Sequence, residues 1–292
     1  MAGAEPCSVP VLFLLPSSRL PNAQFLIQYD MMDLKQALNV RPGELVAFIG
    51  AGSKTTIIWR LLRLLVVSGE RAIFTTTTFT FEPRGTPLLL SSDPEPADIA
   101  RMLIESTFLV LASARERVSA TKNMTSNSQL VHPIKLTGID PSILNDLARR
   151  MPGVTWLVET DAVKRHKLAT MTERHISVPQ ATDRVVISAE LEALGQPLDE
   201  PAVYRPEHAA QLLQVAQGTP ITPPILSNLV NYASWRLQNT RVKASTVALL
   251  SQQDQHPHPQ AEEVANQLLE RELYQRVVLV SLSTADPVLK VW

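Results

Sequence analysis

Cysteine is nearly absent from this chain of 292 residues, in which Cys7 is the single one. One cysteine excludes an internal disulfide and a zinc site built on several thiolates, and it indicates a reducing, cytoplasmic compartment. Glycine is also scarce, with 10 residues against 22 prolines. Glycines that gather in one short turn therefore point to a backbone conformation that other residues adopt poorly.

Excess charge and long apolar runs are lacking as well. The 27 basic and 28 acidic residues leave a formal net charge of −1, so the chain has no bulk positive charge with which to hold nucleic acid. No stretch approaches the about 20 apolar residues that a membrane helix needs. The apolar run at 9–15 is short and follows no basic segment, so we expect no signal peptide. Neither nucleic acid nor a membrane is an expected partner.

Short apolar runs alternate with helical patterns along most of the chain, which is typical of a parallel sheet flanked by helices. We therefore expect a three-layer, P-loop-type α/β domain at 31–292, ending in a strand–helix–strand portion and preceded by an N-terminal appendage at 1–30. Strands are predicted at 45–49, 72–78, 108–111, 131–136, 154–158, 184–188, 246–250 and 277–282, and helices at 56–67, 98–105, 141–151, 206–217, 224–236 and 261–274.

The turn after the first predicted strand carries the most informative motif, Gly50-Ala51-Gly52-Ser53-Lys54-Thr55-Thr56. A phosphate loop needs backbone N–H groups in one concavity at a helix N-terminus, a lysine for the β- and γ-phosphates, and a hydroxyl for Mg²⁺. We predict that Gly50 to Thr56 bind the phosphates of ATP or GTP, that Lys54 is also catalytic, and that Thr55 ligates Mg²⁺. Ser53 stands where the motif has glycine, at a cost of about 1–2 kcal/mol if the position requires positive φ. The alternative is an ordinary strand–helix turn capped by Ser53.

Two carboxylates follow the predicted strand at 154–158, namely Glu159 and Asp161. An acidic residue at the end of a strand beside the phosphate loop holds Mg²⁺ in phosphoryl-transfer proteins. We therefore predict both residues as metal ligands and catalytic groups. The four threonines 75–78 end the second predicted strand, where ligands bind in parallel sheets, and Thr77 is predicted to contact the ligand. Strand propensity alone also explains these threonines.

These motifs together resemble the YqeC family, whose members are described as accessory proteins of selenium-dependent molybdenum hydroxylases. The family pattern runs G-x-G-G-K-T, T-T-T-T, E-A-D-G-[SA]-R and G-[KR]-P-L followed by R-P-E. This chain has residues 50–55, 75–78, 159–164 and 195–198 in that order, followed by Arg205-Pro206-Glu207. The resemblance implies a P-loop α/β protein that binds nucleotide and serves maturation of a molybdenum enzyme's cofactor, with the hydroxylase or its maturation proteins as partners.

The chain departs from that pattern at its candidate site residues. Ser53 replaces glycine, Ala162-Val163 replace Gly-[SA], and Lys164 replaces arginine. An N-K-x-D-like segment becomes Ser251-Gln252-Gln253-Asp254. Asp254 keeps the carboxylate that would read guanine, but the asparagine and lysine that brace such a loop are missing. A solvated loop is the alternative for Asp254. Arg205 can reach a phosphate bidentately or pair with the acidic residues 199–200.

Two hypotheses of function follow. In the first, the chain binds ATP or GTP with Mg²⁺ as an accessory factor and acts as a P-loop NTPase or phosphoryl-transfer enzyme. In the second, it is a non-catalytic P-loop relative that provides a scaffold for a partner or a cofactor. Lys54, Thr55, Glu159 and Asp161 favour the first hypothesis, whereas Ser53 and the altered carboxylate loop favour the second.

Overall fold

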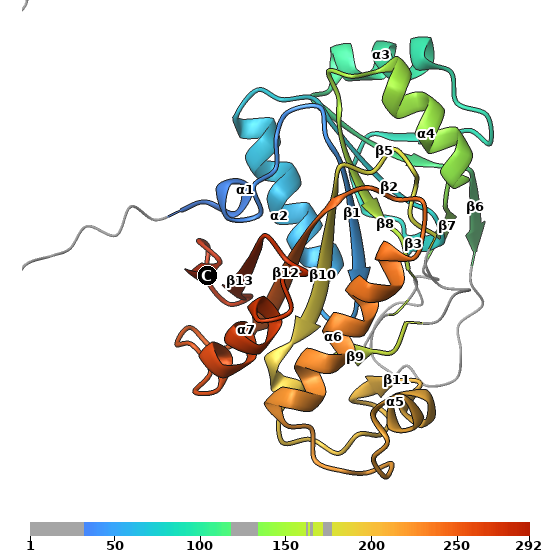
Figure 1. Cartoon of the computed structure of the whole chain (residues 1–292). Coiled ribbons are helices and arrows are strands. Elements are labelled where there is room, and N and C mark those ends of the chain that lie inside the picture. Colours follow the sequence, from blue (N-terminus) through green and yellow to red (C-terminus); the bar gives the residue numbers. More distant parts are fainter. Residues whose placement is uncertain (1–31, 118–133, 162, 164–165, 172–176) are drawn as a thin grey trace, which may run out of the picture. The chain divides into compact units, whose positions relative to one another are not determined.

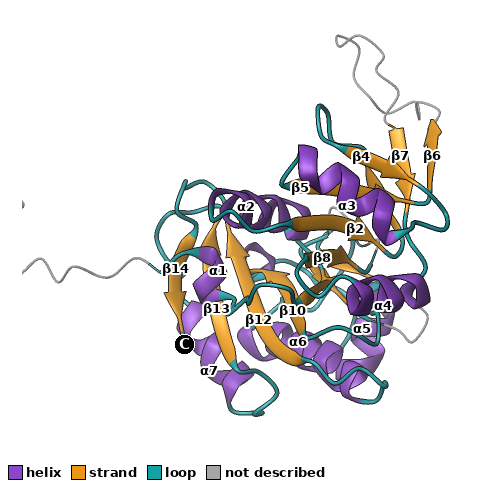
Figure 2. Ribbon diagram, turned by 90° about the horizontal axis from the view of Figure 1, so that it is seen from above, coloured by secondary structure: helices purple, strands orange, loops and turns teal. Residues whose placement is uncertain are grey.

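The computed structural model describes residues 32–117, 134–161, 163, 166–171 and 177–292. All of these belong to the unit Met32–Trp292, and the expected appendage at 1–30 lies outside them. Nine strands of the described residues form one sheet, parallel throughout except for its last strand, which is antiparallel to its neighbour. In spatial order they are β14 (Val288–Val291), β13 (Arg276–Ser281), β12 (Ser245–Gln252), β10 (Arg184–Glu190), β1 (Leu45–Gly50), β8 (Thr155–Glu159), β2 (Ala72–Thr76), β5 (Phe108–Ala112) and β4 (Leu88–Leu90). Figure 1 labels all of them except β14 and β4, which Figure 2 labels.

Helices cover both faces of this sheet, and Figure 2 shows α2 on one side and α6 on the other. Every residue of β1 is buried; Val46 and Phe48 pack toward one face, and Ala47 and Ile49 toward the opposite one. Burial on both faces explains the unbroken apolar run of a central parallel strand. One face carries α1 (Leu34–Ala37) and α2 (Lys54–Val67), and the other carries α3 (Pro96–Glu105), α4 (Pro141–Arg150), α5 (Pro206–Leu213), α6 (Pro223–Gln238) and α7 (Ala261–Leu269). The predicted three-layer α/β fold is confirmed.

Local sequence sets where the helices begin and end. Helices α3, α4, α5 and α6 each open with proline, whose fixed φ suits the first helical turn. The predicted helices at 206–217 and 261–274 are too long. Helix α5 stops at Leu213 because Gln214 adopts a left-handed conformation with φ 55°. Helix α7 stops at Leu269, three residues before the left-handed Glu272.

The described residues also form two small sheets, and all of their strands except β7 are too short to show a period in the sequence. One is antiparallel and contains β3 (Phe79–Phe81), β7 (Ile134–Thr137) and β6 (Ala114–Arg117); the other pairs β9 (Leu168–Ala169) with β11 (Val203–Tyr204) in parallel. The strand predicted at 131–136 corresponds to β7, and residues 131–133 lie outside the described residues. A short 3₁₀ helix, η2 (Leu191–Ala193), follows β10 directly.

The carboxyl ends of four neighbouring strands meet at one edge of the sheet. The register places Glu159 of β8 beside Phe48 of β1 and Thr76 of β2, and it places Ser188 of β10 beside Gly50. Ligands bind at this edge in open parallel sheets. The fold thus brings the loop at 50–55 together with the end of β8. No helix within the described part of the chain is long and apolar enough to cross a bilayer.

Candidate functional site

The loop between β1 and α2 depends on two glycines. Gly50 has φ +102° and Gly52 has φ +86°, values that other residues adopt poorly. An added Cβ would lie 2.3 Å from the Ser188 carbonyl oxygen at Gly50 and 2.6 Å from Glu190 Cγ at Gly52. Ser53, in contrast, has φ −86°. Ser53 is therefore not strained, because its φ is negative. The positive φ values fall on Gly50 and Gly52.

Ser53 instead makes a contact that glycine cannot make. Its hydroxyl donates to Oε1 of Glu190, the last residue of β10, at 2.8 Å. Burial raises the pKa of the Glu190 carboxyl, and the bond from Ser53 opposes this rise. Sequence reasoning missed Glu190, although it ends a buried strand in the same way as Glu159 does. Glu190 connects the loop at 50–55 to β10, the strand on one side of β1.

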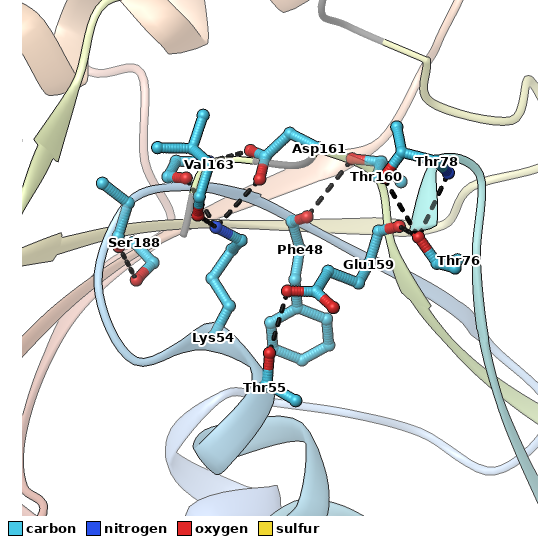
Figure 3. A network of polar contacts seen from close by, with 12 residues as sticks. Phe48, Lys54, Thr55, Thr76, Thr78, Glu159, Thr160, Asp161, Val163 and Ser188 are labelled. Atoms are coloured by element: carbon cyan, nitrogen blue, oxygen red, sulfur yellow. Dashed lines mark hydrogen bonds and ion pairs between the residues drawn. The ribbon is translucent and has the colours of Figure 1, made fainter. Parts of the chain in front are cut away.

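Lys54 points inward, toward the loop itself (Figure 3). Only 1% of its surface is exposed. Its ammonium donates to the Gly50 carbonyl at 2.6 Å and to the Val163 carbonyl at 3.1 Å. The same ammonium lies 2.8 Å from Asp161 Oδ1 in an ion pair that is buried on both sides. A buried charge of this kind is stable only when it is paired and hydrogen-bonded.

Asp161 lies in the loop rather than beside Thr55. Its second carboxylate oxygen accepts the N–H of Gly50 at 2.6 Å. Burial raises the pKa of the Asp161 carboxyl, and the Lys54 ammonium and the Gly50 N–H act against this rise. The expected arrangement, with Asp161 and Glu159 both beside Thr55 on a metal, differs from the one observed. Asp161 instead contacts Gly50 and Lys54, and the His166 carbonyl accepts the N–H of Gly52 at 2.9 Å.

Thr55 and Glu159 do come together as expected. The Thr55 hydroxyl donates to Glu159 Oε1 at 2.9 Å, and the Glu159 side chain is buried. The Glu159 carbonyl accepts from the Thr76 hydroxyl at 2.6 Å and from the Thr77 N–H at 3.1 Å. Glu159 therefore connects the first turn of α2, through its side chain, with the end of β2, through its backbone carbonyl. Thr56 is exposed in the first turn of α2.

Arg205 lies at the N-terminus of α5, in a left-handed conformation with φ 61°. Its guanidinium lies 5.4 Å from the ring centre of Tyr204, and that ring lies 5.3 Å from the ring of His166. His166 in turn accepts from Gly52 through its carbonyl. The His166 ring also contacts Glu200 at 2.8 Å. Arg205 is thus connected to the loop through two aromatic neighbours, while the neighbouring Lys164 and Arg165 lie outside the described residues.

The loop after β12, which carries Asp254, is braced by its own Gln252. The buried Gln252 amide donates to the carbonyls of Asp254 at 2.8 Å and His256 at 2.6 Å, and its oxygen accepts the His258 N–H at 3.0 Å. The expectation of an unbraced loop therefore needs revision. A cavity of about 650 Å³ lies against this loop and is lined by Glu192, Gln252, Gln253, Asp254, His256, Pro257, His258 and Pro259. Glu192 follows Glu190 by two residues and accepts the N–H of Gln253.

Comparison with known families gives a clear result. The model of the family described as YqeC protein matches residues 46–207, which is more than half of the chain. The chain belongs to the YqeC family. The match contains the loop at 50–55, the four threonines, Glu159, Asp161 and Arg205, whereas Asp254 lies beyond it.

A curated relative has the same family name. It is the "Uncharacterized protein YqeC" of Escherichia coli (strain K12), 25% identical over 186 residues that cover 63% of this chain and 65% of the relative. Two solved structures of FtsY are weakly similar. Chloroplast FtsY from Physcomitrella patens is 10% identical with a TM-score of 0.37, over 86% of this chain and 62% of that one. The signal recognition particle receptor FtsY from Elizabethkingia anophelis is 9% identical with a TM-score of 0.35, over 85% and 61%. The chain spans less than two thirds of each of these proteins.

Proposed function

We propose that this member of the YqeC family binds a nucleoside triphosphate together with Mg²⁺ at the carboxyl edge of its sheet. The observation that carries the proposal is the 2.9 Å contact between the Thr55 hydroxyl and the Glu159 carboxylate, one residue from Lys54. In proteins Mg²⁺ takes oxygen ligands, commonly one or two carboxylates together with phosphate oxygens and water. Glu159 would supply a carboxylate oxygen to such a site, and Thr55 would supply a hydroxyl oxygen.

The phosphates would lie at the N-terminus of α2, which has 14 residues. The first N–H groups of a helix have no partner within it, and together with the helix dipole they favour anions. Lys54 would add a full positive charge, and Mg²⁺ would neutralise charge on the phosphates when bound. The Thr77 hydroxyl is buried at the neighbouring strand end and has no hydrogen-bond partner among the described residues. An unsatisfied buried hydroxyl there supports a ligand contact.

The base would lie in the cavity beside Asp254. Its carboxylate can accept hydrogen bonds from the N1–H and 2-amino group of guanine, whereas adenine has no 2-amino group and its N1 is an acceptor. Gln252 fixes the backbone on both sides of Asp254. We therefore propose a modest preference for GTP over ATP. Arg205 remains a proposed phosphate contact of the same site.

The reaction we propose is hydrolysis of the triphosphate or transfer of its terminal phosphoryl group, in the maturation of a molybdenum enzyme's cofactor. The nucleotide part is supported by the geometry above, and the maturation role by the family resemblance. The single cysteine supports a reducing compartment, which we take to be the cytoplasm. A non-catalytic scaffold is the second candidate, and it is favoured by the ion pair that engages Lys54 inside the loop.

Equilibrium binding measured for ATP, GTP, ADP and GDP, each with and without Mg²⁺, tests the proposal. We expect triphosphates to bind more tightly with Mg²⁺ and to raise the melting temperature accordingly. Thr55→Val should remove the Mg²⁺-dependent part of the affinity and leave Mg²⁺-free binding nearly unchanged. Thr86→Val is the matched control, because its hydroxyl only contacts the Pro83 carbonyl in a distant turn. Equal affinities with and without Mg²⁺ in the wild type would contradict the proposed metal site. Turnover of bound triphosphate separates the enzyme from the scaffold.

A further inference from the structure

The Asp161 carboxylate lies inside the phosphate loop as an anion that belongs to the protein. One oxygen lies 2.8 Å from the Lys54 ammonium and the other accepts the Gly50 N–H at 2.6 Å. Both side chains of the pair are 1% exposed. A backbone N–H and a lysine ammonium at the start of a helix are the donors with which a loop of this kind holds a phosphoryl oxygen. In this structure a carboxylate from the chain itself occupies them.

The contacts around the pair show that Lys54 is held away from other anions. Its ammonium donates to the carbonyls of Gly50 and Val163 and forms the ion pair with Asp161, so three oxygens surround the Lys54 nitrogen. Lysine has three donors and no acceptor. A phosphate oxygen can therefore bind Lys54 only by replacing at least one of these oxygens. Asp161 is the anionic one, so it competes with phosphate for the same charge.

We propose that Asp161 is a built-in competitor of the nucleotide: its carboxylate occupies one phosphoryl position of the loop, and the ligand binds by displacing it. This inference rests on the proposed function of the loop. It also names the class of ligand, because a di- or triphosphate carries more negative charge than one carboxylate and can reach Mg²⁺ at Thr55 and Glu159 as well. A single carboxylate or a monophosphate gains less from the exchange.

Competition of this kind lowers the observed affinity. When only a fraction of the protein has the loop free of Asp161, the apparent dissociation constant rises by the inverse of that fraction. Removing the charge of Asp161 should therefore tighten binding, although Asp161 contacts the same lysine that the nucleotide needs. A residue that ligated Mg²⁺ or supported the loop for binding would give the opposite result, because its loss would weaken binding.

The test compares Asp161→Asn with the wild type in equilibrium binding of inorganic triphosphate, ATP and GTP in the presence of Mg²⁺. Asparagine keeps an oxygen for the Gly50 N–H and loses the negative charge. The matched control is Glu44→Gln, which breaks the ion pair between Glu44 and the buried Arg184 at the opposite end of β1. Asp161→Ser provides a second neutral variant, and circular dichroism confirms that each protein is folded at the assay temperature.

We expect Asp161→Asn and Asp161→Ser to bind triphosphate at least about tenfold more tightly than the wild type, a change of about 1.4 kcal/mol. Glu44→Gln should lose stability and keep wild-type affinity. Unchanged or weaker binding by both Asp161 variants would overturn the competition while leaving the proposed function intact. Absence of binding by the wild type and by both variants would overturn the proposed function and, with it, this inference.

Discussion

Replacing Lys54 by methionine should destabilise the protein even without any ligand. The substitution keeps the length of the side chain but leaves the Asp161 carboxylate buried and without its counter-ion, since both groups are 1% exposed. Breaking a buried ion pair from one side costs about 3–5 kcal/mol, because the remaining charge stays out of water. For a domain of this size each kcal/mol corresponds to about 2 °C in melting temperature, so we expect a decrease of about 6–10 °C.

A double-mutant cycle separates this effect from a simple loss of packing. Asp161→Asn alone leaves the Lys54 ammonium buried without its anion and should cost a similar amount. In Lys54→Met/Asp161→Asn neither charge remains, so the double variant should recover most of the stability lost by the single variants. Urea unfolding followed by circular dichroism measures all four proteins. Additive losses, or a Lys54→Met loss below about 1 kcal/mol, would refute the view that the two charges depend on each other.

The stability of Lys54→Met should also depend on pH. Burial raises the pKa of the Asp161 carboxyl and Lys54 opposes that rise, so the pKa in the variant is higher still. The folded variant then binds the proton more tightly than the unfolded chain, whose aspartate pKa is about 3.9. Its stability relative to wild type therefore falls as the pH rises from the pKa of Asp161 in the folded wild type to its higher pKa in the folded variant, and the deficit should be smallest at the acid end, near pH 4. Thermal melts between pH 4 and 8 measure this slope.

Three further substitutions test the loops around the site. Ser53→Gly should lower the unfolding free energy by about 1–2 kcal/mol, since the variant loses the hydrogen bond to Glu190 and gains backbone freedom in the unfolded chain. A gain in stability would mean that serine is strained at position 53. Glu190→Gln should raise the melting temperature at pH 7 but not at pH 4, because burial raises the pKa of Glu190 and makes its ionisation costly in the folded protein. If the melting temperatures of variant and wild type differ by the same amount at both pH values, ionisation of Glu190 is not the cause. Asp254→Ala should abolish the GTP preference over ATP, which we expect within about tenfold; competition binding with an unchanged ratio would show that Asp254 does not read the base.

The sequence predicts the frame of the site because strand ends are local features. An apolar run that ends in glycine, followed by a helical pattern, defines β1 and α2. A second apolar run that ends in Glu159 defines β8. Once the strands are parallel neighbours, their carboxyl ends must meet, and the pair Thr55 and Glu159 follows. These inferences need only the order and the direction of the strands.

The direction of side chains beyond a strand end could not be predicted in this way. Asp161 lies only two residues past β8, yet its contact with Lys54 depends on how the chain crosses the loop, which no local pattern encodes. The φ of Ser53 depends on the positive φ of Gly50 and Gly52, which absorb the tight part of the turn. In the sequence Gln252 only marks the absence of a lysine, whereas in the structure its amide bonds to three backbone groups in the residues that follow it.

The contact between Ser53 and Glu190 has a consequence for how the family varies. In the family pattern position 53 is glycine, which offers no hydroxyl to a carboxylate at position 190. The close approach of Glu190 Cγ to Gly52, in contrast, depends only on the glycine that both versions share. Members with glycine at 53 should therefore accept a wider range of side chains at 190, while those with serine should retain an acceptor there. The two positions are expected to change together across the family, although 136 residues separate them in the sequence.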